Sequence, residues 1–129
     1  MCGIIGIKGK LPEQKRFEAA RDTIKHRGPD DAGIFYSPEA GIALGHCRLS
    51  IIDLSAAGQQ PLWSNDGRYS IIFNGEIYNY VEIQKEIGER YAFQTQTDTE
   101  VLLASYSIWI EKCLERLNCM FAFALWDRE

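Results

Sequence analysis

The chain has 129 residues, enough for one domain with a buried core, and 46% of them are hydrophobic while 25% are charged. A formal net charge of −4 without a basic cluster argues against nucleic acid or an anionic membrane as the main partner. No apolar run is long enough to span a membrane and no signal peptide is visible, so we expect a cytoplasmic protein with a small-molecule partner.

The first half of the chain predicts a strand, a helix and a hairpin. Residues 2–8 are expected to form a buried strand, and residues 13–26 carry apolar side chains at helical spacing. Two short strands at 33–36 and 41–47 follow, with a turn at 37–40 between them. This half therefore predicts one helix packed on an antiparallel sheet.

The second half of the chain also predicts both strands and helices. An Asp-Gly pair predicts a hairpin that leads into a strand at 69–73. A helix is expected over 80–90, and another begins near Thr97, because Thr97 and Glu100 have the spacing of a capping box. Residues 120–126 predict an apolar strand. Helices mixed with hairpin-linked strands indicate an α+β fold with antiparallel sheets, in a single domain over residues 1–129.

Cys2 is the residue with the most distinctive chemistry. If Met1 is removed, Cys2 carries both a thiol and a free α-amine, which together supply a nucleophile and its base. The alternative is that residue 2 is a cysteine by chance and the strand behind it is only core. The irregular spacing of the cysteines (Cys2, Cys47, Cys113 and Cys119) favours reduced thiols. With no C-x-x-C pair and only two histidines, no structural zinc site is expected.

Seven motifs in this order resemble the N-terminal glutaminase domain of glutamine-dependent asparagine synthetases, a class II amidotransferase domain of the N-terminal-nucleophile hydrolase type. The resemblance covers residues 1 to 129. The motifs are Met1-Cys2-Gly3-Ile4-Ile5-Gly6, His26-Arg27-Gly28-Pro29-Asp30, Arg48-Leu49-Ser50-Ile51-Ile52-Asp53, Gln60-Pro61-Leu62, Asn74-Gly75-Glu76-Ile77-Tyr78-Asn79, Thr97-Asp98-Thr99-Glu100-Val101, and Met120-Phe121-Ala122-Phe123-Ala124.

The resemblance implies that Cys2 attacks the carboxamide of L-glutamine. It implies that Asn74 and Gly75 stabilise the oxyanion and that Asp98 pairs with the substrate ammonium. It also implies a substrate-binding set. The members of that set are Arg48 for the α-carboxylate, Leu49, Ser50, Ile51 and Ile52 through their backbone, Asn74, Gly75, Glu76 and Asp98.

Each of these residues also has a plainer explanation. Arg48 would ordinarily be a surface arginine, and Asp98 an acidic residue that complements a helix dipole. An isolated Asn74-Gly75 pair is usually a type I′ turn. His26 and His46 are expected to be structural, because an α-amine makes a histidine base unnecessary.

For the fold, the resemblance implies a four-layer α/β/β/α sandwich that is incomplete at its C-terminus, with further strands missing beside residues 120–126. The domain is expected to need no metal or other cofactor. ATP and magnesium are expected only in the synthetase domain, which is absent from residues 1–129. The exposed sheet edge predicts self-association.

Two alternatives to the asparagine synthetase function remain. One is an amidotransferase domain of another pathway, such as surface-polysaccharide assembly. The other is a non-catalytic fragment, or interaction module, that keeps only the fold.

Overall fold

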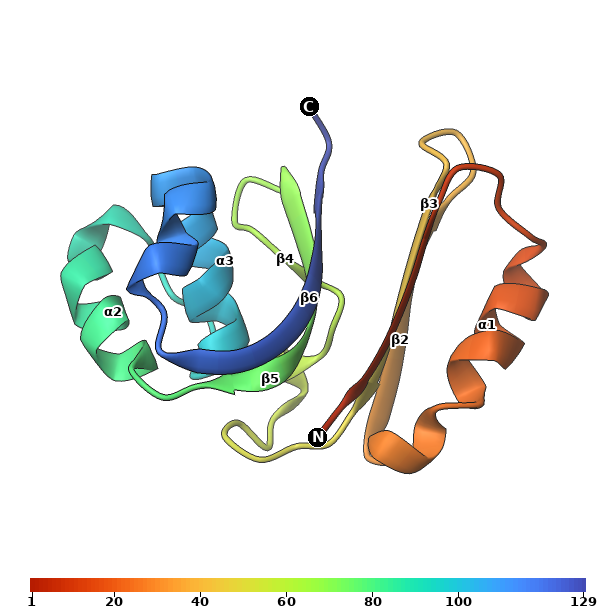
Figure 1. Cartoon of the computed structure of the whole chain (residues 1–129), viewed down its shortest axis with the longest axis horizontal. Coiled ribbons are helices and arrows are strands. Elements are labelled where there is room, and N and C mark those ends of the chain that lie inside the picture. Colours follow the sequence, from red (N-terminus) through yellow and green to blue (C-terminus); the bar gives the residue numbers. More distant parts are fainter.

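The computed structural model describes residues 1–129 as four layers, with two antiparallel sheets packed face to face and helices on both outer faces (Figure 1). In chain order the helices and strands are β1 (Gly3–Lys8), α1 (Gln14–Asp22), β2 (Asp31–Ser37), β3 (Ile42–Arg48), β4 (Leu62–Trp63), β5 (Tyr69–Ile77), α2 (Tyr80–Ile87), α3 (Asp98–Trp109) and β6 (Cys119–Asp127). Short 3-10 helices occupy Lys25–Arg27, Ala56–Gly58, Gly88–Arg90 and Ile110–Arg116.

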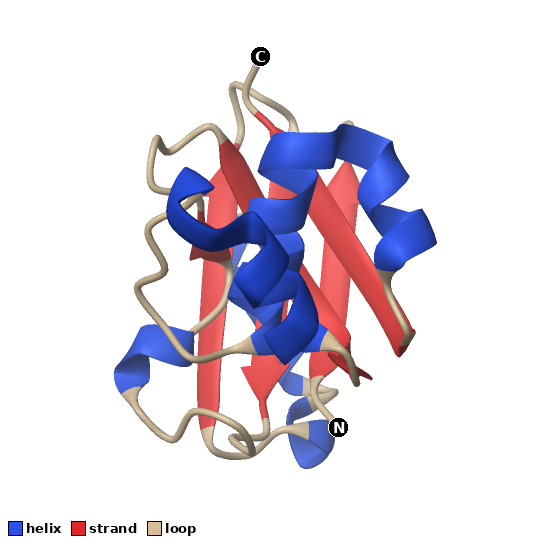
Figure 2. Ribbon diagram, turned by 90° about the vertical axis from the view of Figure 1, so that its left-hand side faces the viewer, coloured by secondary structure: helices blue, strands red, loops and turns tan.

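Each sheet has three strands. The N-terminal sheet has the order β1-β3-β2 and is covered by α1, and the C-terminal sheet has the order β4-β5-β6 and is covered by α2 and α3 (Figures 1 and 2). The β5–β6 ladder is the longest and runs from Tyr69↔Asp127 to Ile77↔Cys119. β4 is only two residues long and pairs with Ile71 and Ser70 of β5.

Alternation along the strands separates two apolar cores. Ile42 and Leu44 of β3 pack with Ile72 of β5 between the sheets. Alternate residues of β5, among them Ile71 and Phe73, face the helices and join a larger cluster that includes much of α3. Residues 69–73 of β5 are therefore buried on both faces of the strand, as their apolar sequence suggests.

The structure confirms the predicted α+β class and the four-layer arrangement, and it corrects two element boundaries. The helix predicted over 13–26 ends at Asp22, because the hydroxyl of Thr23 bonds the carbonyl of Ala20 and competes with the helical pattern. The strand predicted over 69–73 continues to Ile77. The alternative prediction of a type I′ turn at Asn74-Gly75 is therefore wrong, since both residues lie within the β5–β6 ladder.

The predicted helix start at Thr97 is confirmed, with half of the capping box. The Thr97 hydroxyl accepts a hydrogen bond from the Glu100 N–H at 3.2 Å. The Glu100 carboxylate instead accepts from the N–H groups of Gln94 and Thr95, and it thereby holds the loop before α3. None of the helices has the length and apolar character needed to cross a membrane.

Candidate active site

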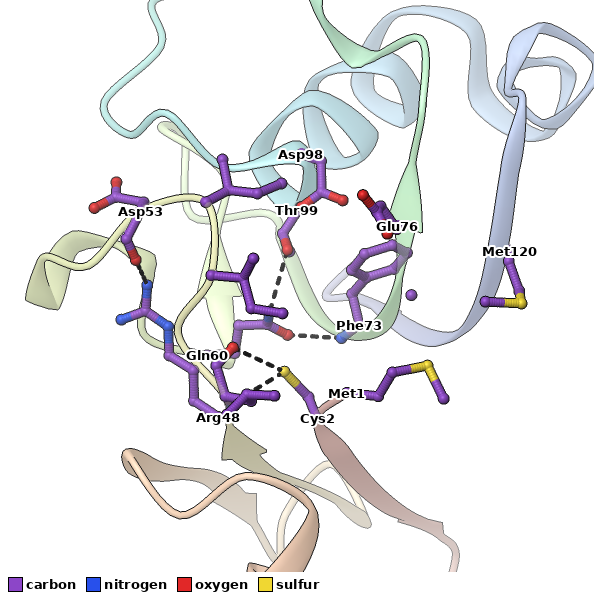
Figure 3. Close-up of a pocket in the computed structure, with 14 residues that line it drawn as sticks. Met1, Cys2, Arg48, Asp53, Gln60, Phe73, Glu76, Asp98, Thr99 and Met120 are labelled. Atoms are coloured by element: carbon purple, nitrogen blue, oxygen red, sulfur yellow. Dashed lines mark hydrogen bonds between the residues drawn. The ribbon is translucent and has the colours of Figure 1, made fainter.

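A cavity of about 180 Å³ lies at the end of the two sheets where the chain begins (Figure 3). Its walls come from the residues before β1, the segment after β3, β5, the first turn of α3 and β6. Of the ten predicted site residues, eight line it: Cys2, Arg48, Leu49, Ile51, Ile52, Gly75, Glu76 and Asp98. Segments far apart in the sequence thus meet here.

Cys2 is half-buried directly before β1, and the backbone of Leu49 holds its sulfur in place. The N–H of Leu49 points to Cys2 Sγ at 3.4 Å, and the sulfur in turn lies 3.7 Å from the Leu49 carbonyl oxygen. On the other side, Arg27 donates a hydrogen bond from Nε to the Cys2 carbonyl at 3.0 Å. Side chain and backbone of Cys2 are therefore both fixed toward the cavity.

The loop after α1 forms the wall behind Cys2. The Asp30 N–H donates to the Arg48 carbonyl at 3.0 Å, and the Asp30 carboxylate accepts from the Ser50 N–H at 2.8 Å. A Cβ added at Gly28 would lie 2.3 Å from the Cys47 carbonyl oxygen, so only glycine permits this approach. Ser50 is thus part of the supporting wall and does not line the cavity.

Arg48 ends β3 and is buried, with 7% of its surface exposed. Its guanidinium turns toward the loop beyond it and donates to the Asp53 carbonyl (Figure 3) and, at 2.7 Å, to the Ser55 carbonyl. Gly58 packs directly on the guanidinium, since a Cβ there would lie 2.2 Å from Nη2. Carbonyl dipoles therefore hold this cation in place, and two of its N–H groups are already engaged.

Asp98 stands at the first turn of α3 and is also buried, with 6% exposed. Its Oδ2 accepts a hydrogen bond from the Ile77 N–H at 3.1 Å. Burial raises the pKa of this carboxyl above its usual value, against the lowering effect of the Ile77 and Thr99 N–H groups, and the nearby Glu76 charge raises it further. The ionised carboxylate is thus costly here unless a cation arrives.

Arg48 and Asp98 are opposite charges on one cavity, and neither forms an ion pair in the protein. The ion pairs lie elsewhere, between Arg21 and Asp22, Arg68 and Asp127, Arg68 and Glu129, and Arg116 and Glu86. A buried charge without a partner is expensive, so such groups are often kept to bind a charged ligand. The cavity is therefore electrically complementary to a zwitterion.

Asn74 and Gly75 lie side by side on β5, opposite Ala122 and Phe121. Gly75 lines the cavity, and a Cβ at this position would lie 2.3 Å from the Met120 carbonyl oxygen. Asn74 is not part of the lining, and its Oδ1 is buried without a hydrogen-bond partner. The protein itself makes no use of that oxygen.

Neither histidine lines the cavity. His26 is exposed and has Nδ1 near the Thr23 carbonyl oxygen at 3.2 Å. His46 is buried, and its Nε2 lies 3.2 Å from the Phe73 carbonyl oxygen, so Nε2 must carry the proton. Burial lowers the pKa of His46 from 6.5 to about 4, which keeps the ring neutral at neutral pH. Both positions agree with the structural role expected for them.

Sequence reasoning missed six lining residues: Met1, Asp53, Gln60, Phe73, Thr99 and Met120. Gln60 and Thr99 belong to motifs that carry the resemblance, so their membership in those motifs was the available signal. Met120 likewise begins a motif that carries the resemblance, whereas Phe73 gave no signal beyond its place in an apolar strand. No group of three or more His, Cys, Asp or Glu side chains lies close enough together to hold a metal ion.

Comparison with known proteins gives a consistent assignment. The family described as "Glutamine amidotransferase domain" matches residues 1–129. The chain is 43% identical, over 99% of its length, to a protein named asparagine synthetase [glutamine-hydrolyzing] 1 of Bacillus subtilis, and 45% identical, over its whole length, to asparagine synthetase B [glutamine-hydrolyzing] of Escherichia coli.

The same comparison extends to a solved structure. The glutamine phosphoribosylpyrophosphate amidotransferase of B. subtilis superposes with a TM-score of 0.82 at 20% identity, covering 98% of this chain and 35% of that one. This supports the N-terminal-nucleophile hydrolase fold. The chain spans 21% and 24% of the length of the two asparagine synthetases. With the family match extending over all 129 residues, the chain belongs to the glutamine amidotransferase domain family.

Proposed function

We propose that the chain is the glutaminase part of a glutamine-dependent asparagine synthetase, and that Cys2 hydrolyses L-glutamine to release ammonia. The observation that carries this proposal is the pair of buried, oppositely charged residues Arg48 and Asp98, neither of them in an ion pair, on the cavity that holds the Cys2 thiol. Free glutamine offers a carboxylate for the first, an ammonium for the second and a carboxamide for the third.

In the proposed complex the substrate ammonium lies against Asp98, with Glu76 adding negative charge nearby. The α-carboxylate takes the N–H groups of Arg48 that the Asp53 and Ser55 carbonyls leave free. The carboxamide then reaches Cys2. The ammonium would favour the ionised form of Asp98 against the effect of burial, so binding and ionisation support each other.

The reaction proceeds through a covalent thioester. The thiolate sulfur of Cys2 forms a bond to the carboxamide carbon, and the C=O electron pair moves onto oxygen. The Gly75 N–H and the Asn74 side-chain amide donate to this oxyanion. The intermediate collapses as its nitrogen gains a proton and leaves as ammonia, and water then cleaves the thioester to give glutamate and the free thiol.

The α-amine of Cys2 is the proposed base, and it becomes available when Met1 is removed. Met1 is 58% exposed and lines the same cavity, so its bond to Cys2 is reachable and its loss widens the entrance. A free α-amine has a pKa of about 8, which suits it to take the thiol proton and pass it to departing ammonia.

The use of the ammonia is assigned from the relatives named asparagine synthetase. We propose that a synthetase domain in the full-length protein receives it and amidates aspartate, with ATP and magnesium acting in that domain and no cofactor in this one. A cytoplasmic location is proposed too, and the four unpaired cysteines are compatible with a reducing compartment.

Ammonia release from glutamine tests the proposal, measured for the native chain and for Cys2→Ala. We expect release by the native chain and none above background for the variant. A glutamine-mimicking electrophile should label Cys2 alone, although the structure contains three other thiols as internal controls. Equal ammonia release by the two proteins would overturn the assignment. Intact mass measured on the same sample reports whether Met1 has been removed.

A further inference from the structure

Gln60 carries a buried carboxamide that joins two walls of the cavity. Its Oε1 accepts a hydrogen bond from the Phe73 N–H at 2.6 Å, and its Nε2 donates to the Thr99 hydroxyl at 3.1 Å (Figure 3). Only 6% of Gln60 is exposed. One side chain therefore connects β5 with the first turn of α3.

Gln60 can bond the backbone of Phe73 because β4 is short. The β4–β5 ladder ends at Leu62↔Ile71, so Phe73 lies two residues beyond the last pair. Side chains bond its backbone there: Gln60 binds the N–H, and His46 of the other sheet donates from Nε2 to the carbonyl. An unpaired buried backbone group is unfavourable, so these two hydrogen bonds fix β5 at this point.

Gln60 is also held against the N-terminal sheet. A Cβ added at Gly33 of β2 would lie 2.0 Å from the Gln60 carbonyl oxygen, which shows how closely the two backbones approach. Cys2 precedes β1 of that same sheet. The carboxamide of Gln60 therefore has a defined position relative to the thiol, to β5 and to α3.

We propose that Gln60 is a positioning residue that sets the separation between the oxyanion donor at Gly75 and the ammonium site at Asp98. Gly75 follows Phe73 by two residues, and Asp98 adjoins Thr99, so both bonds of Gln60 act directly beside these groups. Since both ends of its carboxamide are engaged by the protein, Gln60 acts through Phe73 and Thr99. This inference rests on the proposed glutaminase function.

The bridge can be removed from either end with little change of shape. Thr99→Val deletes the hydroxyl that accepts from Gln60, Thr99→Ser keeps it, and Gln60→Met removes both hydrogen bonds. We expect Thr99→Val and Gln60→Met to lower kcat/KM for glutamine by about 10- to 100-fold, as for a misplacement on the scale of 1 Å. Thr99→Ser should stay within about threefold of the native value.

A double-mutant cycle separates positioning from direct contact with substrate. If the Thr99 hydroxyl acts through Gln60, the Thr99→Val/Gln60→Met double variant loses no more than Gln60→Met alone. If the hydroxyl binds substrate directly, the losses multiply. Ser107→Ala is the control, because its hydroxyl bonds the Leu103 carbonyl within α3 and Ser107 does not line the cavity.

Amide hydrogen exchange tests the bridge independently of activity. Gln60→Met should speed exchange at the Phe73 N–H, with a smaller effect for Thr99→Val, while Ile72 and the rest of the β5–β6 ladder keep native protection. A native chain that releases no ammonia would refute the glutaminase function without affecting this readout. Native exchange at Phe73 in Gln60→Met, or multiplicative losses in the cycle, would overturn the positioning role.

Discussion

Oδ2 of Asp98 accepts a hydrogen bond from the Ile77 N–H at 3.1 Å, a contact that needs an acceptor oxygen but no charge. An asparagine at position 98 can accept the same bond through its amide oxygen. Recognition of the ammonium and support of the backbone can therefore be separated by a single substitution.

Asp98→Asn is expected to stabilise the free protein and weaken substrate binding. Above its raised pKa the ionised carboxyl is a cost to the folded state, which a neutral amide avoids, so the free energy of unfolding should rise by about 0.5–2 kcal/mol at pH 7. Loss of a charge-assisted contact should lower kcat/KM for glutamine by roughly 10- to 100-fold.

Denaturant unfolding and steady-state kinetics check this prediction. The stability difference should shrink as the pH is lowered toward the usual Asp value, because the native carboxyl then becomes neutral as well. A variant that is both less stable and fully active would contradict the assignment of Asp98.

Arg48→Lys tests the cation. Lysine keeps the charge but loses the planar fork, so it cannot bond the Asp53 and Ser55 carbonyls and a substrate carboxylate together. We expect KM for glutamine to rise by about 10-fold or more, while iodoacetamide alkylates Cys2 at the native rate. An unchanged KM would place the α-carboxylate elsewhere.

His46 should make the fold sensitive to mild acid. Its pKa is about 4 in the folded chain against 6.5 for an ordinary histidine, with Arg48 lowering it and Asp31 raising it in addition to burial. As the pH falls, the unfolded chain binds a proton at His46 near pH 6.5, whereas the folded chain does so only near pH 4. The free energy of unfolding therefore decreases between pH 6.5 and 4, by up to about 3 kcal/mol.

Chemical denaturation from pH 7.5 to 4 measures this dependence. His46→Gln should show a shallower loss over the same window, because glutamine does not titrate, even if the variant starts from lower stability. Parallel curves for the two proteins would rule out His46 as the source.

Gly75→Ala should damage both fold and activity. The new methyl would meet the Met120 carbonyl at 2.3 Å, so β6 must shift and the N–H at position 75 moves with it. We expect a destabilisation of about 1–3 kcal/mol and a loss in kcat of about 10²-fold. Gly6→Ala is the control, since its Cβ would lie 3.6 Å from Leu44 and fits.

The edge of β6 should pair with a second copy of the chain. β6 is the outer strand of its sheet, contains no charge, glycine or proline over 119–126, and exposes Met120 and Phe121. Two copies related by a twofold axis at Phe123 bring no like charges together. Sedimentation should show a concentration-dependent dimer that Phe121→Lys weakens and Val81→Lys, on the exposed face of α2, leaves intact.

The sequence could predict what depends on local pattern and on residue chemistry. The strands, the start of α3 at Thr97 and the gathering of Cys2, Arg48 and Asp98 all follow from periodicity, capping and resemblance. The family assignment then agrees with the motifs that suggested it.

Other features depended on contacts between distant segments. Asn74-Gly75 has the composition of a turn, yet pairing with β6 keeps it extended. Gln60 gains its proposed role only because β4 ends early and leaves the Phe73 N–H without a backbone partner on that side of β5. No residue near either position in the sequence signals the pairing with β6 or the early end of β4, so local sequence rules could not predict these contacts.

Cys2 precedes a strand of one sheet, whereas Gly75 and Asp98 belong to the other sheet and its covering helix. The distance from nucleophile to substrate anchor therefore depends on the thickness of the apolar layer formed by Ile42, Leu44 and Ile72 between the sheets. Substitutions in that interior would change which length of amino-acid side chain places its carbonyl at the sulfur. A change in the volume of this core would therefore be expected to change the substrate preference as well.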